Sequence, residues 1–140
     1  MSNPLNEMLR CQSVVILDGG LATSLEERGH KLDSHLWSAR VLLDAPEAIE
    51  TVHRLFIEAG ADCITTASYQ VSYEGLSRAG HDKASVDQLL ISSVRLARDA
   101  VDGFWSNDDN PTGRLRPLVA ASVGPYGAHL ADGSEYVGGY

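Results

Sequence analysis

The chain has 140 residues, 44% of them hydrophobic, and a formal net charge of −8 from 11 Lys and Arg against 19 Asp and Glu. This length and hydrophobic content allow one ordinary domain with a real core and exclude a disordered chain. The acidic balance, without any basic run, disfavours a nucleic-acid or membrane-surface partner and favours small soluble ligands. No stretch reaches the roughly 20 apolar residues of a membrane helix, and residues 1–10 lack a signal-peptide pattern, so we expect a cytoplasmic protein. Cys11 and Cys63 are expected to be reduced thiols.

An apolar run of β-branched and aliphatic residues at positions 14–17 is followed directly by Asp18, Gly19 and Gly20. Such a run predicts a strand buried on both faces, as in a parallel sheet, and the residues after it keep helical spacing up to Gly29. A carboxylate is therefore expected at the carboxyl end of a buried strand, beside two glycine amides and the amino terminus of a helix. In α/β proteins this is where ligands bind.

A helix and a second strand are expected in the next part of the chain, after a long connection over residues 29–43. Asp44, with Glu47 three residues later and Pro46 in the first turn, is typical of a helix start. The short apolar run at residues 61–66 predicts a strand that leads into small and polar residues. The buried face of the helix is expected to comprise Ile49, Val52, Leu55, Phe56 and Ala59.

A third strand is expected after two further helices. A short helix over residues 73–78 precedes the clearest helix of the sequence, which begins at a Ser85 cap and ends near Gly103. A polar loop follows at residues 105–116, and the apolar run at residues 118–123 predicts the third strand. The buried face of the long helix is expected to comprise Val86, Leu90, Val94, Ala97 and Val101.

The predicted element order is β-α-β-α-β, which makes the strands parallel neighbours in one sheet. An open doubly wound sheet and the first part of an eight-stranded barrel share this order. The G-x-G-x-x-G and G-x-x-x-x-G-K-S/T fingerprints are absent after the first strand, which disfavours the familiar nucleotide-binding versions. The fold class is therefore α/β.

Three segments together resemble the homocysteine S-methyltransferase family: residues 17–26, residues 65–70, and residues 122–128 continued by 130–136. Residues 36–39 fit the same pattern. The resemblance covers nearly the whole chain and is closest to the branch that uses S-methylmethionine or S-adenosylmethionine as methyl donor. It implies methyl transfer to L-homocysteine, giving methionine, on a (β/α)₈ barrel. Such a barrel needs about 250 residues, so residues 1–140 are expected to form only its amino-terminal β-α-β-α-β portion, a partial homocysteine-binding domain.

The resemblance also implies a catalytic zinc in the complete enzyme. Zinc would bind the homocysteine thiol as thiolate, and the sulfur would attack the methyl group of the sulfonium donor. The family holds this zinc with three cysteines in motifs that are absent here, so the ligands are expected to lie outside this chain. Cys63 is expected to be a small buried hydrophobe.

The resemblance assigns the ammonium group of the amino acid to Asp18 and its carboxylate to the amides of Gly19 and Gly20. A simple helix cap is the alternative role for Asp18. Trp37 and Tyr69 are expected on the donor side, since aromatic faces attract cations; core packing and a loop hydroxyl are the alternatives.

Hydroxyl groups supply the remaining candidate contacts. Thr66 is expected to contact the substrate past the second strand, and Ser68 and Tyr126 are further candidates. For Ser122 turn chemistry is favoured. The five histidines, at positions 30, 35, 53, 81 and 129, lack metal-binding spacing and are expected on the surface.

Two other functions remain open on the sequence. A non-enzymatic partial barrel would bind an amino acid or associate with another chain through open sheet edges. A complete small α/β domain with unrelated chemistry would rest on the Asp-Gly-Gly turn alone. The partners expected from the resemblance are L-homocysteine and a sulfonium methyl donor, with neither nucleic acid nor membrane.

Overall fold

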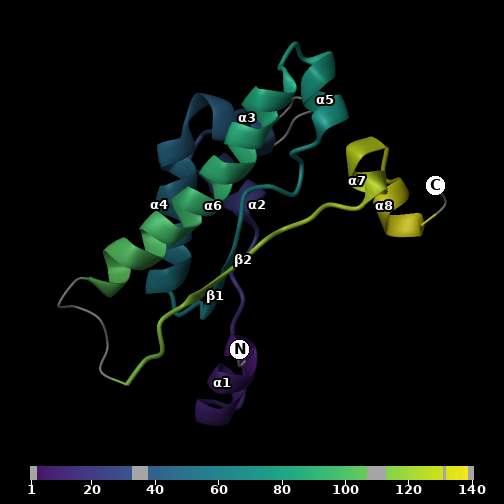
Figure 1. The fold of residues 1–140 in the computed structure, drawn as a ribbon. Helices are drawn as coiled ribbons and strands as arrows, with labels where there is room; N and C mark the ends of the chain where they lie inside the picture. The colour runs from purple at the N-terminus through teal and green to yellow at the C-terminus, as the bar shows by residue number, and fades with distance from the viewer. Residues whose placement is uncertain (1–2, 33–37, 107–112, 131, 139–140) are drawn as a thin grey trace.

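The computed structural model describes residues 3–32, 38–106, 113–130 and 132–138. Helices predominate around two short parallel strands, so the fold is α/β as predicted (Figure 1). No helix within these ranges is both long and apolar enough to cross a bilayer. The elements are α1 Pro4–Cys11, α2 Leu21–Glu27, α3 Ser38–Asp44, α4 Pro46–Glu58, β1 Cys63–Thr65, α5 Tyr73–Arg78, α6 Lys83–Trp105, β2 Leu118–Ala120, α7 Tyr126–Leu130 and α8 Ser134–Val137.

The two strands lie where the sequence predicted the second and third strands. They pair in parallel, with Cys63 opposite Leu118 and Thr65 opposite Ala120, and α6 lies between them in the chain. Each strand is three residues long and therefore shorter than predicted. The parallel β-α-β unit that positions the later loops is thus confirmed.

Residues 14–17 lie parallel to β1, as predicted for the first strand, but they do not form a regular strand. Only one parallel bridge, from Leu17 to Cys63, joins this segment to β1. Ile16 donates its amide to the carboxylate of Asp62 at 2.9 Å, so a side chain replaces the backbone carbonyl that a regular ladder would supply. The predicted burial is also wrong, since Val14, Ile16 and Leu17 are 63%, 53% and 61% exposed. Within the described residues no strand lies on the outer side of this segment, and both of its faces meet solvent.

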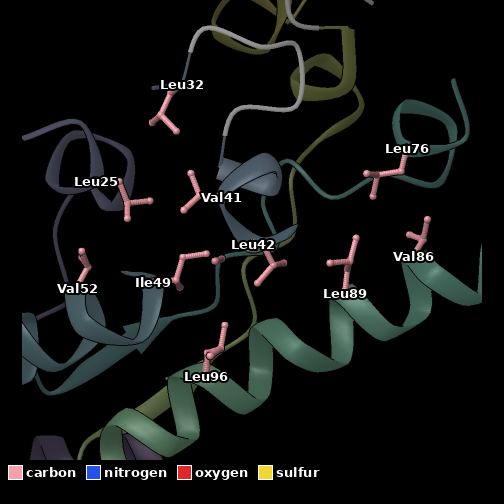
Figure 2. Close-up of a cluster of buried hydrophobic side chains, with 11 residues drawn as sticks. Leu25, Leu32, Val41, Leu42, Ile49, Val52, Leu76, Val86, Leu89 and Leu96 are labelled. Carbon is pink, nitrogen blue, oxygen red and sulfur yellow. The ribbon is translucent and has the colours of Figure 1, made fainter. Parts of the chain in front are cut away.

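The five helices α2 to α6 form one layer with its own apolar core. A cluster of buried side chains joins α2, α3, α4, α5 and α6, and Figure 2 shows Leu25, Val41, Ile49 and Leu89 among those that converge there. A second cluster, which includes Ile64 of β1, ties α4 and α6 to the strands. The core therefore lies between the helices and on one face of the sheet.

The helix starts differ from the predictions by a few residues. Asp44 is the last residue of α3, and its carboxylate binds Arg40 at 2.5 Å, whereas α4 starts at an Ala45 cap without a side-chain hydrogen bond. The predicted connection at residues 29–43 thus contains most of α3. The α6 cap is Asp82, which accepts a hydrogen bond from the Ser85 amide at 2.8 Å, so the helix begins before Ser85. Asp44 therefore pairs with Arg40 and does not cap α4, whereas Asp82 caps α6 three residues before the predicted Ser85.

The buried helix faces were predicted in part. On α4, Ile49 and Val52 are buried as expected, but Leu55 and Ala59 are exposed and Ile57 is buried instead. On α6, Leu90 and Val94 are only half-buried. The α6 residues that are buried are Val86, Leu89, Ser93, Leu96, Ala97, Ala100 and Val101. α4 packs against α2, α3, α6 and β1, so its buried face is wider than a single stripe.

The prediction that the histidines lie on the surface is wrong for His53. Its side chain on α4 is completely buried, and neither ring nitrogen has a hydrogen-bond partner among the described residues. Burial lowers the pKa of the imidazole to about 4, so the ring is neutral at neutral pH. His35 and the side chain of His129 lie outside the described part of the chain.

Candidate functional site

Three segments of the chain end at the same edge of the sheet: the loop after Leu17, the loop after β1 and the loop after β2. Asp18 lies in the first of these, and its amide donates to the carbonyl of Cys63 at 3.0 Å. The carboxylate of Asp18 accepts the Thr65 amide at 2.8 Å through Oδ2, and the Thr65 hydroxyl lies 3.0 Å from both carboxylate oxygens. Asp18 therefore joins the first segment to the end of β1.

The electrostatic setting of Asp18 has two opposing parts. Half-burial raises the pKa of its carboxyl above the ordinary value, while the hydrogen bonds from Thr65 act in the opposite direction. Asp18 does not cap α2, because the cap residue is Gly20 and no side chain binds the first turn. The alternative role as a helix cap is therefore wrong.

Three polar groups from the two later loops form a closed hydrogen-bonded ring. The Ser122 amide donates to Thr66 Oγ1 at 2.9 Å, and the Ser68 hydroxyl donates to the Ser122 carbonyl oxygen at 2.7 Å. Thr66 Oγ1 and Ser68 Oγ are 2.6 Å apart. Because the carbonyl can only accept, the single proton of Ser68 is already used, and Thr66 must be the donor between the hydroxyls. Each hydroxyl oxygen thus retains one lone pair and no proton for a ligand.

Two glycines allow the close approach of these loops. A Cβ atom at Gly124 would lie 2.3 Å from the carbonyl oxygen of Tyr69, so the backbone after β2 touches the backbone after β1. A Cβ atom at Gly19 would lie 2.8 Å from the Phe56 ring, so Gly19 packs directly on α4. Gly124 therefore requires glycine for space, because a backbone atom blocks it, whereas a side chain at Gly19 would only force the Phe56 ring to move.

The predicted site residues fall into three groups. Asp18, Thr66 and Ser68 lie in loops at the edge described above, and Gly19 and Gly20 follow Asp18 in the chain. The aromatic candidates Tyr69 and Tyr126 are 39% and 59% exposed, the latter at the start of α7. Trp37 lies outside the described residues. The substrate contacts assigned to these residues stay predictions.

Sequence reasoning missed three residues that hold β1 in place, with Thr65 at its carboxyl end and Asp62 and Arg114 near its amino end. Thr65 holds Asp18, and Asp62 accepts both the Ile16 amide and the Gln12 side chain, the latter at 2.7 Å. Arg114, in the predicted polar loop, donates to the Ile57 and Ala61 carbonyl oxygens at 2.7 and 2.5 Å. The sequence shows only that Asp62 and Thr65 lie in a short apolar run. This does not reveal which groups their side chains bind.

The described residues do not fit a zinc site. They contain no group of three His, Cys, Asp or Glu side chains that would hold a metal ion. Cys11 and Cys63 are both free thiols, as expected, and Cys63 is buried. Burial, followed by the Asp18 and Asp62 carboxylates, raises the pKa of the Cys63 thiol, which opposes the thiolate that a metal needs. The location of the zinc ligands in the complete protein stays a prediction.

Comparisons with known proteins point to one family. A family model described as homocysteine S-methyltransferase matches residues 15–140. Homocysteine S-methyltransferase YbgG of Bacillus subtilis is 47% identical over 138 residues, which are 99% of this chain and 44% of that protein. Homocysteine S-methyltransferase of Escherichia coli is 49% identical over 140 residues, again 99% of this chain and 44% of that protein.

A solved structure has the same fold over the matched part. The crystal structure of the homocysteine methyltransferase MmuM from Escherichia coli, in its metallated form, matches with a TM-score of 0.91 and 48% sequence identity. The match covers 99% of this chain and 47% of that one, so the chain spans less than half the length of the relatives it matches. Because the family model takes in nearly all of the sequence, this chain belongs to the homocysteine S-methyltransferase family.

Proposed function

We propose that the whole protein transfers a methyl group from S-methylmethionine or S-adenosylmethionine to L-homocysteine, giving methionine, and that this chain holds the amino-acid end of homocysteine. Family membership supports the reaction class. The non-enzymatic alternative has no comparable support. The sulfur of homocysteine forms a new bond to the methyl carbon while the donor's bond to that carbon breaks, and the part of this chain is to bind and orient.

The observation that carries the proposal is the set of free acceptors at the edge of the sheet. Asp18 offers a carboxylate, and the Thr66 and Ser68 hydroxyls retain lone pairs but no proton. An ammonium group has only donors, so it complements this set. A carboxylate does not, because it needs donors.

The amides of Gly19 and Gly20 offer the complementary donors. Neither amide has a recorded hydrogen-bond acceptor within the described ranges. They follow Asp18 directly, so a ligand whose ammonium binds Asp18 has its carboxylate within reach of these amides. An α-amino acid carries its ammonium and carboxylate groups on one carbon. Binding groups on neighbouring residues, such as Asp18 and Gly19, suit two ligand groups that are so close together.

The barrel assignment is part of the same proposal. We infer that residues 14–17, β1 and β2 correspond to the first three strands of a (β/α)₈ barrel whose remaining units this chain does not span. The parallel pairing of β1 and β2 and the loops meeting at their carboxyl ends support this. Zinc, with ligands outside the described residues, remains the metal that we propose for the whole protein.

The proposal is tested by titrating the purified chain with L-homocysteine and with 4-sulfanylbutanoic acid, which lacks the amino group. Calorimetry is expected to give at least tenfold weaker binding for the second compound, because a hydrogen bond to a charged group is worth about 1.5–3 kcal/mol. Asp18→Asn is expected to weaken homocysteine binding by a similar factor. Asp99→Asn, an exposed carboxylate on α6, is the matched control and should leave affinity unchanged.

Equal binding of the two compounds, together with no effect of Asp18→Asn, would contradict the assigned orientation. For the reaction itself, methionine formation from homocysteine and S-methylmethionine is measured on the whole protein. Asp18→Asn is expected to lower kcat/KM at least tenfold there. Unchanged kcat/KM would remove Asp18 from the site.

A further inference from the structure

Thr65 is bonded to Asp18 through every proton that it can donate. Its amide lies 2.8 Å from Oδ2, and its single hydroxyl proton is shared between Oδ1 and Oδ2 at 3.0 Å each. No other described residue donates to this carboxylate. The orientation of the Asp18 carboxylate is thus set by one neighbour.

The backbone around this contact is fixed independently of the side chains. The Asp18 amide binds the Cys63 carbonyl, and Thr65 pairs with Ala120 in the strand ladder. With both backbones held, the torsion of the carboxylate is the remaining freedom, and the Thr65 hydroxyl is the side-chain group that restricts it. Threonine suits this task because β-branching limits its own χ1 rotation.

We propose that Thr65 is a positioning residue of the amino-acid site, which holds the Asp18 carboxylate in the orientation that receives the substrate's ammonium group. This inference rests on the proposed function of Asp18. Thr65 acts through Asp18, since its hydroxyl proton is already committed to that carboxylate. Thr65 follows Ile64, which packs on the helices, and side chains alternate along a strand, so Thr65 points to the face opposite the helical core.

The electrostatic contribution of Thr65 has the same direction. Burial favours the protonated carboxyl of Asp18, and the two hydrogen bonds from Thr65 favour the ionised form. When the Thr65 hydroxyl is removed, one of the hydrogen bonds that counteract the effect of burial is lost. The pKa of the Asp18 carboxyl then rises, and a smaller fraction of it is ionised. A protonated carboxyl no longer forms an ion pair with an ammonium group, so the loss of affinity depends on pH.

The experiment compares the chain with Thr65→Val, which keeps the shape and removes the hydroxyl, and Thr65→Ser, which keeps the hydroxyl. The Asp18 carboxyl is titrated by carbon NMR without ligand, and L-homocysteine affinity is measured from pH 6 to pH 8. We expect Thr65→Val to move the Asp18 titration to higher pH and to weaken homocysteine binding about tenfold, with the larger loss at the lower end of this pH range. Thr65→Ser is expected to restore both properties. Thr51→Val, which removes an exposed hydroxyl on α4, is the control and should change neither.

The two ideas fail in different ways. An unchanged Asp18 titration in Thr65→Val overturns the inference, whatever ligand binds. A shifted titration in Thr65→Val, with no homocysteine binding by the unaltered chain, supports the control of Asp18 by Thr65 and overturns the proposed function. Thr65→Ala also removes the hydroxyl and replaces Thr65→Val in the comparison where the amide spectrum shows that valine disturbs β1.

Discussion

Lowering the pH is expected to destabilise the chain through His53. The imidazole is completely buried on α4, and its two nitrogens lack partners among the described residues. Protonation therefore places an uncompensated charge in the helical core, which lowers the pKa of the folded state from 6.5 to about 4. The unfolded chain binds this proton more readily, so the stability is fully present above pH 6.5 and is lost as the pH falls.

The size of the loss follows from the two pKa values. Each unit of difference corresponds to 1.36 kcal/mol, so the free energy of unfolding is expected to fall by about 1 kcal/mol at pH 5.5 and about 3 kcal/mol at pH 4.5, relative to pH 7.5. Below pH 4 the folded state also binds the proton, and the loss stops growing. This contribution is a large part of the 5–15 kcal/mol that holds a typical domain together.

The assay is urea denaturation of the chain and of His53→Leu at pH 7.5, 6.5, 5.5 and 4.5. Carboxylates titrate in both proteins, so the difference between the two pH profiles isolates the imidazole. Leucine has similar volume and cannot be protonated, so His53→Leu is expected to show a flatter profile. His30→Gln controls for the removal of a histidine elsewhere. Parallel profiles for the chain and His53→Leu would refute the argument, because the buried ring would then accept a proton without cost.

Two further predictions concern contacts between loops and helices. Gly124→Ala is expected to lower the free energy of unfolding by about 1–3 kcal/mol, because the new methyl group would lie 2.3 Å from the Tyr69 carbonyl oxygen. Gly103→Ala, on α6 with open space around it, should leave stability unchanged or raise it by up to about 1 kcal/mol in the same urea assay, and equal losses at both glycines would contradict the steric argument. Arg114→Ala is expected to cost about 1–3 kcal/mol in thermal and urea denaturation, since it frees two carbonyl oxygens. Arg116→Ala breaks only an exposed ion pair and should cost less than about 1 kcal/mol; the reverse order would refute this reading.

Helix ends were predictable because glycine marks them chemically. Gly29 and Gly60 have φ values of +88° and +110°, a region that glycine adopts readily, and each follows a helix as the sequence indicated. The first residues of helices were harder to predict. Asp82 and Ser85 are both residue types that cap helices well, and only the observed hydrogen bond shows that Asp82 is the cap of α6. Local chemistry thus determined the ends of helices better than their beginnings.

Burial depends on neighbours that a single sequence does not identify. The apolar run at residues 14–17 has the composition of a buried strand, yet its burial requires partners on both sides, and the structure supplies one. His53 shows the opposite error, because histidine is usually exposed, although its spacing of four residues from both Ile49 and Ile57 puts it on the packed side of α4. In both cases the tertiary surroundings overrode the residue type.

The candidate site was predicted in its residues but not in its internal connections. The motifs singled out Asp18, which binds Thr65, and Thr66 and Ser68, which bind each other, at the same end of the sheet. The direction of the hydroxyl ring depends on the Ser122 backbone, for which turn chemistry was favoured, and that backbone donates and accepts in the ring. Thr65 was missed because neighbouring side chains point to opposite faces of a strand. The sequence does not show whether Thr65 or Thr66 points toward Asp18.

The exposed segment at residues 14–17 also has a colloidal consequence. Its outer edge and apolar side chains can receive a strand from another molecule, and the net charge of −8 on each copy opposes that encounter. Repulsion reaches about 30 Å at 0.01 M ionic strength and about 8 Å at 0.15 M, so added salt removes the protection while leaving the edge intact. Raising the ionic strength is therefore expected to shorten the time for which a concentrated solution of this chain stays dispersed.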